Sequence, residues 1–389
     1  MRSFQYVATL PRVFCGPDSL AALGRELERL ERKRAVIVCG GSFARSGAPL
    51  ALVRTALGQR FAGVYDGVRA HSPLPVVLAA ADALRKLDAD AVVAVGGGSA
   101  VVTARAAAIV LAEGADVRAL ATSRDDRGQL RSPKLLVPKL PQFVVPTTPN
   151  TATVKAGTAV HDPSSGERLA MFDPKTRAQA VFVHPDILAT APPALVVSAS
   201  LDTLTLALEG LMSAAASPMS DASLMHAIRL IARRLMDDAG FGDGDARIDL
   251  MLGAVLCGHG TDSTGAGIAT VLGHAVGGSL GAENGVVKAV LMPYALRFNA
   301  DAAADGILKI AAALEAVLHR RDSLIDSITD TLGRMFAQLG VPRCLRDVGV
   351  PRETIPAVAA AAMGDWFLRG NPRPVRSPVE LVELLEAAW

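Results

Sequence analysis

The sequence predicts an α/β protein in which an N-terminal Rossmann-like parallel-sheet domain is followed by an all-helical C-terminal domain. With 389 residues the chain is too long for one small core, so two domains are expected. In the first half, short apolar runs alternate with helical patterns, as in a parallel sheet covered on both faces. After residue 188 the pattern is helical almost throughout. We therefore expect one domain at 1–188, a second at 189–389, and an active-site cleft between them.

Hydrophobic spacing and turn residues place the individual elements. Apolar runs of the kind that form buried parallel strands lie at 34–41, 61–68, 91–95, 143–148 and 180–185. Between them, helices are predicted at 72–90 and 100–114. The charged, proline-containing segment 118–142 is expected to be a surface excursion. In the second domain, helices are predicted at 196–216, 221–240, 246–260, 305–318, 324–340 and 377–389.

Composition excludes several classes of protein. The net charge is +2, with 40 basic and 38 acidic residues, which gives no argument for binding nucleic acid or an anionic membrane. The four cysteines form no CxxC and are expected to be reduced thiols. No secretory segment and no uncharged membrane span is recognised. We expect a cytoplasmic protein with a small-molecule substrate.

The most informative motif is a glycine turn between a strand and a helix. Gly96, Gly97, Gly98 and Ser99 follow the run "AVVAV" and open the next helix. Such a turn lets a phosphate approach bare backbone N–H groups at the positive end of the helix dipole. The alternative is a tight turn without a ligand.

A second glycine turn favours NADP over NAD as the cofactor. Gly40, Gly41 and Ser42 end the run "AVIVC", and Arg45 follows closely. Dinucleotide-binding folds that use NAD place an acidic residue at this strand end. Its absence would accommodate a 2'-phosphate, which Arg45 could bind; the alternative is a solvated arginine.

A third polar turn follows the strand predicted at 143–148. Thr147, Thr148 and Asn150 could donate or accept hydrogen bonds to a nicotinamide, a ribose or a substrate. Because threonine and proline are common in turns, this signal is weak by itself.

In their order along the chain, these segments resemble the iron-containing alcohol dehydrogenase family, including its maleylacetate reductase branch. The matching stretches are "RVFCGPDSLAALG" (12–24), "GGGS" (96–99), "PTT" (146–148), "LDTLTLALEGLMS" (201–213) and "GHAVGGSLGAENGVVKAVLMPYALRFN" (273–299). The resemblance implies the related dehydroquinate synthase-like architecture, NAD(P)-dependent interconversion of carbonyl compounds and alcohols, and a homo-oligomer such as a dimer.

The chain departs from the family at the metal site. The family holds iron or zinc with one aspartate and three histidines, and Asp202 matches the aspartate. Leu206, Thr270 and Asn284 stand where the three histidines are expected. Leucine cannot ligate a metal, and neutral threonine and asparagine are poor ligands for a first-row divalent ion. We therefore expect no catalytic metal.

Further departures lie near the cofactor motifs. The family pattern GGGSxxDxAK has Val102 in place of Asp and Arg105 in place of Lys here. PTTxGTGSE has Ala152 in place of Gly and Val154 in place of Glu. The resemblance thus supports cofactor binding more firmly than ordinary hydride chemistry.

Without a metal, His274 is the candidate acid. An imidazole that titrates near neutrality can protonate a reduced carbonyl oxygen. Thr270, Asn284 and Tyr294 could add hydrogen bonds. Asp202 could act as acid or base, and Lys288 or Arg168 could hold a substrate carboxylate. The alternative is that His274 is a packed core residue.

Three functions remain open on the sequence. The leading one is a metal-independent, NAD(P)H-dependent reductase of a small polar carbonyl compound, either a keto acid or an aldehyde. The second is a non-redox lyase, dehydratase or cyclase of specialised metabolism on the same fold. The third is a ligand-binding protein without catalysis.

Overall fold

The protein consists of two compact units. The computed structural model describes residues 4, 6–7, 11–125, 130–237, 244–316 and 323–389. One unit, here called the α/β unit, comprises Thr9–Pro192 and Gly242–Met251. The other, the helical unit, comprises Met1–Ala8, Pro193–Phe241 and Leu252–Trp389. The predicted fold class is confirmed, because parallel strands fill the first unit and helices fill the second.

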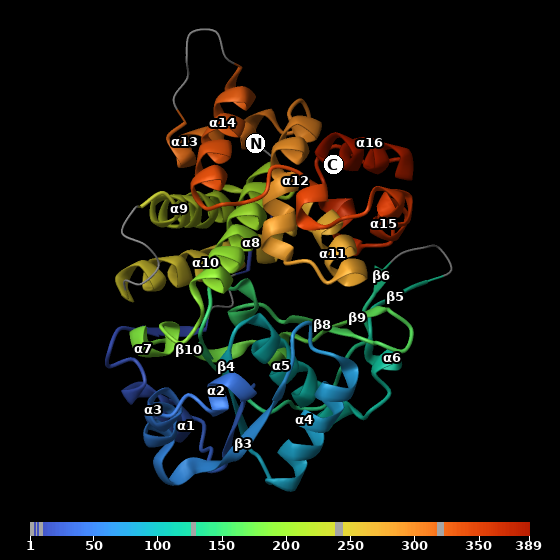
Figure 1. Ribbon diagram of the computed structural model, residues 1–389. Helices are drawn as coiled ribbons and strands as arrows, with labels where there is room; N and C mark the ends of the chain where they lie inside the picture. Colours follow the sequence, from blue (N-terminus) through green and yellow to red (C-terminus); the bar gives the residue numbers. More distant parts are fainter. Residues whose placement is uncertain (1–3, 5, 8–10, 126–129, 238–243, 317–322) are drawn as a thin grey trace. The chain divides into compact units, whose positions relative to one another are not determined.

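A six-stranded parallel sheet forms the centre of the α/β unit (Figure 1). Its strands are β1 (Arg12–Cys15), β2 (Ala35–Gly40), β3 (Phe61–Val68), β4 (Ala91–Gly96), β7 (Gln142–Pro146) and β10 (Ala178–Val183). Their order across the sheet is β1-β10-β7-β4-β2-β3. The chain thus builds β2 and β3 toward one edge and then adds β4, β7 and β10 on the other side of β2.

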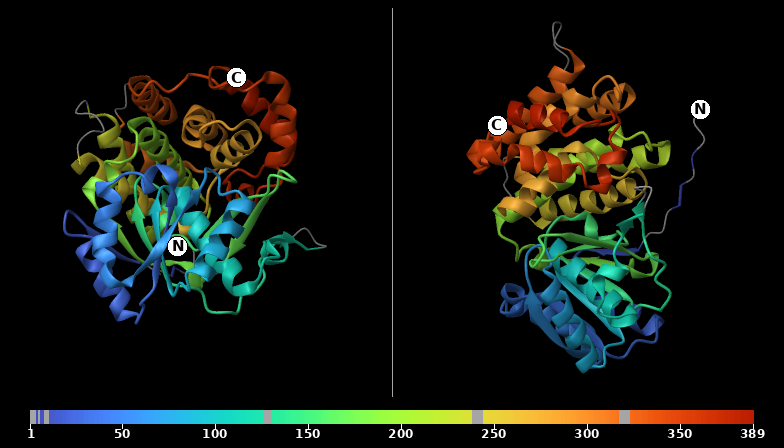
Figure 2. Two further views of the ribbon diagram at one scale, coloured as in Figure 1. Left: turned by 60° about the horizontal axis from the view of Figure 1, so that its bottom comes forward. Right: turned by 90° about the vertical axis from the view of Figure 1, so that its right-hand side faces the viewer.

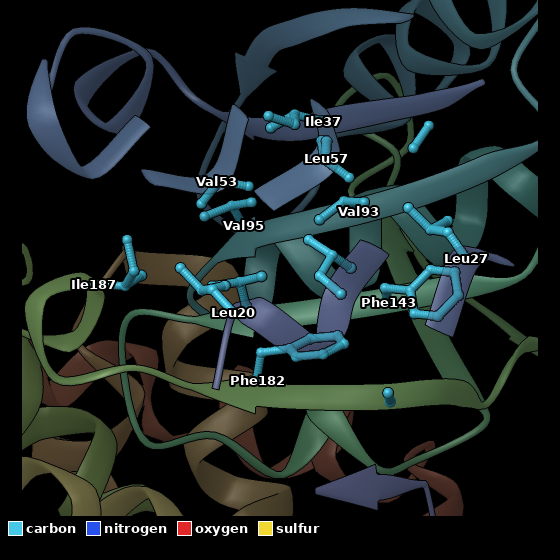
Figure 3. Close-up of a cluster of buried hydrophobic side chains, with 14 of the residues drawn as sticks. Leu20, Leu27, Ile37, Val53, Leu57, Val93, Val95, Phe143, Phe182 and Ile187 are labelled. Carbon is cyan, nitrogen blue, oxygen red and sulfur yellow. The ribbon is translucent and has the colours of Figure 1, made fainter. Parts of the chain in front are cut away.

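Side chains alternate between two buried faces of this sheet. Ile37, Val93 and Val95 point into a cluster that also holds Phe143 and Phe182 (Figure 3). The residues between them, such as Val36 and Val92, are equally buried on the opposite face. A strand buried on both faces reads as a continuous apolar run, which is why these strands were predictable.

Helices cover both faces of the sheet (Figure 1 and Figure 2). Helices α1 (Ala21–Arg29) and α3 (Ala48–Leu57) contribute leucines and a valine to the cluster in Figure 3. Helices α4 (Leu74–Lys86) and α5 (Gly98–Glu113) pack on each other and on the strands. The unit also contains α2 (Gly41–Ala44), α6 (Val117–Leu120), α7 (Pro185–Leu188) and two antiparallel strand pairs, β5 with β6 (Ser123–Arg124, Leu130–Arg131) and β8 with β9 (Gly157–His161, Arg168–Phe172).

The helical unit is built around α8 (Pro193–Met212), which packs against α9, α11, α12 and α13. The other helices of the unit are α9 (Pro218–Leu235), α10 (Gly244–Thr264), α11 (Ile268–Leu280), α12 (Asn284–Asn299), α13 (Ala304–Leu314), α14 (Leu324–Gln338), α15 (Ile355–Ala362) and α16 (Pro378–Ala388). By length and composition alone α8 could cross a membrane, but 78% of its most apolar window is buried inside the protein. Its apolarity is therefore that of a core helix.

Several expected boundaries shift. Helix α10 begins within the α/β unit, since Arg247 donates hydrogen bonds to the carbonyl oxygens of Leu188 (2.6 Å) and Ala191 (2.8 Å). The first turns of α10 were expected in the second domain, 189–389, but they belong to the α/β unit. The last strand ends at Val183 rather than at 185, because His184 caps α7 through its Nδ1. The ends expected at 240 and 318 lie outside the described residues.

Candidate functional site

Three polar turns lie side by side at the carboxyl edge of the sheet. They follow β2, β4 and β7, which are neighbours in the sheet. The backbone N–H of Thr147 donates to the carbonyl oxygen of Gly96 at 3.0 Å, joining two of the turns directly. The chain reverses its direction of growth between β2 and β4, and open α/β sheets bind ligands at such a switch point. The structure thus brings together the three segments predicted to bind the cofactor.

The turn after β4 requires glycine at its first two positions. Gly96 has φ +145°, and a Cβ there would lie 2.8 Å from the Cβ of Ala100. A Cβ on Gly97 would lie 2.9 Å from Oγ1 of Thr148. Gly98 begins α5, so the unpaired backbone N–H groups of its first turn are next to this bare turn. The carbonyl oxygen of Ser99 accepts a hydrogen bond from Oγ of Ser72 at 3.1 Å, which fixes the first turn of α5.

The third turn offers a polar atom that has no partner. Asn150 donates from Nδ2 to the carbonyl oxygen of Thr148 at 2.9 Å. Its Oδ1 is buried and accepts no hydrogen bond from any residue that the structure describes. A buried acceptor without a donor is costly, and the carboxamide or a ribose hydroxyl of a dinucleotide would satisfy it. The residues of this edge therefore fit a nicotinamide dinucleotide.

The turn after β2 carries both signs of charge. Arg45 ends α2 and folds back, so that its Nη1 would lie 3.0 Å from a Cβ on Gly41. Burial raises the pKa of the Cys39 thiol to about 12, and the negative charge of Asp66 on β3 adds to that rise. Gly40 and Ser42 complete the turn. The structure thus adds a carboxylate, Asp66, that the sequence argument for NADP left out.

Arg105 has a structural position. The side chain is fully buried, and it donates to the carbonyl oxygens of Gly157 (2.8 Å) and Ala152 (2.6 Å). It therefore ties α5 to the segment that follows the third turn. Val154 is buried nearby in the same segment. Of the positions that depart from the family pattern, Arg105 and Ala152 are therefore joined by a hydrogen bond.

In the helical unit, three packed helices each contribute two residues one turn apart. Helix α8 packs on α11 and α12, and α11 packs on α12. Residues four apart share a helix face. The pairs are Asp202 and Leu206 on α8, Thr270 and His274 on α11, and Asn284 and Lys288 on α12.

Lys288 lies against the one predicted metal ligand that the chain retains. Its Nζ is 2.6 Å from Oδ1 of Asp202. The lysine side chain is 4% exposed and the aspartate side chain 36%. Gly273 makes room for the lysine, since a Cβ there would lie 2.6 Å from Cγ of Lys288. Sequence reasoning named Lys288 for a substrate carboxylate and did not foresee this ion pair.

Thr270 is engaged by a residue that sequence reasoning missed. Glu209 of α8 accepts from the hydroxyl of Thr270 at 2.5 Å and from its backbone N–H at 3.1 Å. It thereby caps α11. Burial raises the pKa of Glu209, although these hydrogen bonds oppose the rise. The hydroxyl of Thr270 is thus engaged by Glu209, and its expected role as a donor to a substrate stays a prediction. The sequence signal that could have identified Glu209 is its place as the single glutamate of the apolar helix α8.

His274 has an acidic partner far away in the sequence. Its Nδ1 lies 3.0 Å from Oδ2 of Asp365, and both side chains are mostly buried, at 15% and 11% exposed. Asp365 is itself fixed, because its Oδ1 accepts from the backbone N–H of Phe367 at 2.9 Å. The ring of Phe367 lies 6.0 Å from that of His274. This pairing, 91 residues apart, had no local signal in the sequence.

Asn284 is wedged against the neighbouring helix. A Cβ on Gly277 would overlap its Oδ1, which is buried and accepts no hydrogen bond among the described residues. The adjacent Glu283 accepts from Oγ of Ser198 at 3.2 Å. The expected role of Asn284 as a donor to a substrate stays a prediction.

The donor set does not fit the metal that the family resemblance implies. Leu206 is apolar and buried. Asp202 faces the ammonium of Lys288, which already neutralises it. Within the described part of the chain, no group of three or more His, Cys, Asp or Glu side chains is placed to hold an ion. A first-row divalent ion needs imidazole, thiolate or carboxylate ligands that these helices do not bring together.

Comparison with known proteins identifies the same family over most of the chain. The family model for iron-containing alcohol dehydrogenase matches residues 11–185, and that for the C-terminal part of the Fe-containing alcohol dehydrogenase family matches 196–389. Lactaldehyde reductase of Escherichia coli (strain K12) is 32% identical over 382 residues, covering 96% of this chain and 97% of that protein.

Two further similarities cover nearly the same length. Maleylacetate reductase 1 of Cupriavidus pinatubonensis is 28% identical over 385 residues, covering 97% of this chain and 95% of that protein. A crystal structure of 1,3-propanediol oxidoreductase superposes with a TM-score of 0.87 at 25% identity, covering 100% of both chains.

Proposed function

The chain belongs to the iron-containing alcohol dehydrogenase family, and from this premise we propose that it reduces a small polar carbonyl compound with NAD(P)H and without a bound metal. The substrate is a keto acid or an aldehyde. One contrast carries the proposal. The glycine turn at Gly96–Gly98 leaves room for a dinucleotide, whereas the ammonium of Lys288 contacts Asp202, the one expected metal ligand that is present.

The residues at the carboxyl edge of the sheet hold the dinucleotide. The turn at Gly96 and the N-terminus of α5 bind the diphosphate through backbone N–H groups. Oδ1 of Asn150 accepts a hydrogen bond from the cofactor, which satisfies that buried atom. When bound, the reduced nicotinamide supplies a hydride, with two electrons, to the carbonyl carbon.

His274 supplies the proton. Asp365 engages Nδ1 and fixes the orientation of the ring, so that Nε2 is the nitrogen that carries the proton to the substrate oxygen. The carbonyl thereby gains a hydride at carbon and a proton at oxygen and becomes an alcohol, and the imidazole regains its proton from water. A positioned acid of this kind contributes about 10²–10⁴-fold to the rate.

The choice between the two dinucleotides rests on Arg45 and Asp66. A guanidinium at the end of β2 favours NADPH, while a carboxylate on the adjacent strand favours NADH through the ribose hydroxyls. Both charges are close to the same turn. The cofactor is therefore NADP or NAD, and Arg45 decides between them.

The deciding experiment measures turnover and metal content together. Purified protein, dialysed against a chelator, is assayed with NADPH and NADH on a panel of keto acids and aldehydes, and its metals are measured by elemental mass spectrometry. We expect turnover that the chelator leaves unchanged and only traces of metal. Stoichiometric iron or zinc would overturn metal independence. A product formed without loss of reduced nicotinamide would select the non-redox lyase, and tight binding without any product would select the ligand-binding protein.

A further inference from the structure

Lys288 lies next to two of the four positions at which the family resemblance implies metal ligands. It lies one turn beyond Asn284 on α12, and it contacts Asp202 on α8. Resting on the proposed function, we propose that the Lys288 ammonium takes the place of the family's metal ion as the positive charge that binds the oxygen of the carbonyl being reduced.

The surroundings of Lys288 are arranged to hold a charge in a nearly closed site. The lysine stem lies over Gly273, where any larger residue would collide with it. The ammonium is held 2.6 Å from Asp202, and its positive charge also acts on the buried Glu209. Withdrawing the ammonium of Lys288 from water is costly, and an ion pair in a protein interior is often no more stabilising than apolar side chains. Stability alone therefore gives little reason for this pair.

The ion pair retains capacity for a ligand. An ammonium has three N–H donors, and Asp202 is its ion-pair partner within the described residues. Asp202 is 36% exposed, so the pair is open on the aspartate side. A carbonyl oxygen that enters there can accept a second N–H of Lys288.

The chemistry requires a positive charge that stays in place. Transfer of a hydride to the carbonyl carbon leaves negative charge on the oxygen. An N–H of Lys288 stabilises that oxygen by a hydrogen bond and keeps its own proton, while His274 supplies the proton that completes the alcohol. A single ammonium is a weaker electrophile than a divalent ion, which restricts the enzyme to activated carbonyls such as keto acids and polar aldehydes.

The first test removes the charge and keeps the length of the side chain. Lys288→Met should lower kcat/KM by about 100- to 1,000-fold, as removal of an oxyanion donor does, and equally for a keto acid and for an aldehyde without a carboxylate. The matched control is Lys309→Met, which breaks another lysine–aspartate pair, Lys309–Asp221 at 2.8 Å, in the same unit. The control should change kcat/KM by less than about threefold.

Three results would overturn the proposal. One is a loss confined to keto acids, because Lys288 would then hold the substrate carboxylate. Another is a loss of less than tenfold with both substrates. The third is a lost affinity for the dinucleotide, measured by quenching of protein fluorescence, since the proposal requires that affinity to be unchanged.

The second test needs no enzymatic activity, so it separates failure of this proposal from failure of the proposed function. Two variants both carry Leu206→His, Thr270→His and Asn284→His, and one of them also carries Lys288→Ala. Any loss of folding from the three shared histidines affects both. Cobalt(II) should bind the variant with Lys288→Ala, seen by its visible absorption, and should bind at least about tenfold more weakly when Lys288 is present. Equal binding would place Lys288 away from the metal position and sink the idea.

Discussion

The carboxyl edge of the sheet and the three-helix cluster around Asp202 have diverged to different degrees. At the sheet edge, Gly96–Gly98 match the family pattern although Val102, Arg105 and Val154 depart from it nearby. In the helical cluster, Leu206, Thr270 and Asn284 stand where the family resemblance implies metal-binding histidines. A site made of backbone N–H groups survives side-chain change, whereas a coordination site does not.

The largest expected effect tests whether His274, in the three-helix cluster, is the proton donor. His274→Ala should lower kcat by about 10²–10⁴-fold and leave the affinity for the dinucleotide unchanged, because the proton donor is lost. Stopped-flow measurement of nicotinamide oxidation gives kcat, and His226→Ala, an exposed histidine on α9, is the control. If kcat falls less than tenfold, His274 is a packed core residue.

Dinucleotide binding at the sheet edge can be tested at one glycine. Gly96→Val forces a branched side chain into φ +145° and against Ala100. Such backbone strain costs about 1–3 kcal/mol, and relieving it would distort the turn. The affinity for the dinucleotide should therefore fall about tenfold to a hundredfold. Gly114→Val is a matched control, because Gly114 also has a positive φ, +109°, at the other end of α5. Titration by fluorescence measures both, and equal losses would show that strain alone, and not the turn, is responsible.

A smaller change sharpens the specificity of the same edge. Arg45→Ala should weaken NADPH about tenfold, as loss of a charge-assisted hydrogen bond does, and should leave NADH within about twofold. Arg25→Ala, an exposed arginine on α1, should alter neither. Comparison of KM for the two cofactors gives the answer, and an equal effect on NADH would remove the basis for preferring NADP.

The smallest effect concerns the buried acid beside the cluster. Burial raises the folded-state pKa of Glu209 above its unfolded value of 4.5, so the folded protein holds the proton more tightly. The free energy of unfolding should therefore fall as pH rises from 4.5 through the folded pKa. Glu209→Gln lacks this titration, so its melting temperature relative to the wild type should increase across that range.

Glu380 provides a contrast of opposite sign. Its pKa is lowered, first by the backbone N–H of Arg376, which donates to the carboxylate at 2.7 Å. Its contribution to stability is present above the unfolded value of 4.5 and is lost as pH falls through the lowered folded pKa. Glu380→Gln should therefore be less stable than the wild type at neutral pH, with the difference vanishing in acid. Parallel pH profiles for the two variants would contradict the assignment of Glu209.

Much of the fold was predictable, because its signals are local. The strands β2, β4 and β7 are apolar runs with buried side chains on both faces, and such runs identify themselves. The short strand β1, with exposed and half-buried residues, carries no such pattern, and the hydrophobic spacing does not predict it. The start of α10 in the α/β unit depends on hydrogen bonds from Arg247 to distant carbonyls, which no local pattern encodes.

By itself, the sequence determined which chemical groups are present: a glycine turn after β4, one histidine in an apolar helix, and Leu206, Thr270 and Asn284 where the family resemblance implies metal-binding histidines. Those are properties of single positions and short spacings. The tertiary structure alone decided their partners: Asp365 for His274, Glu209 for Thr270, and Lys288 for Asp202. The two residues of each pair lie 61 to 91 positions apart in the sequence. Only the packing of the folded chain brings such residues together. The physical reason is that hydrophobic periodicity reports which face of a helix is buried, and not which side chain of another helix it meets.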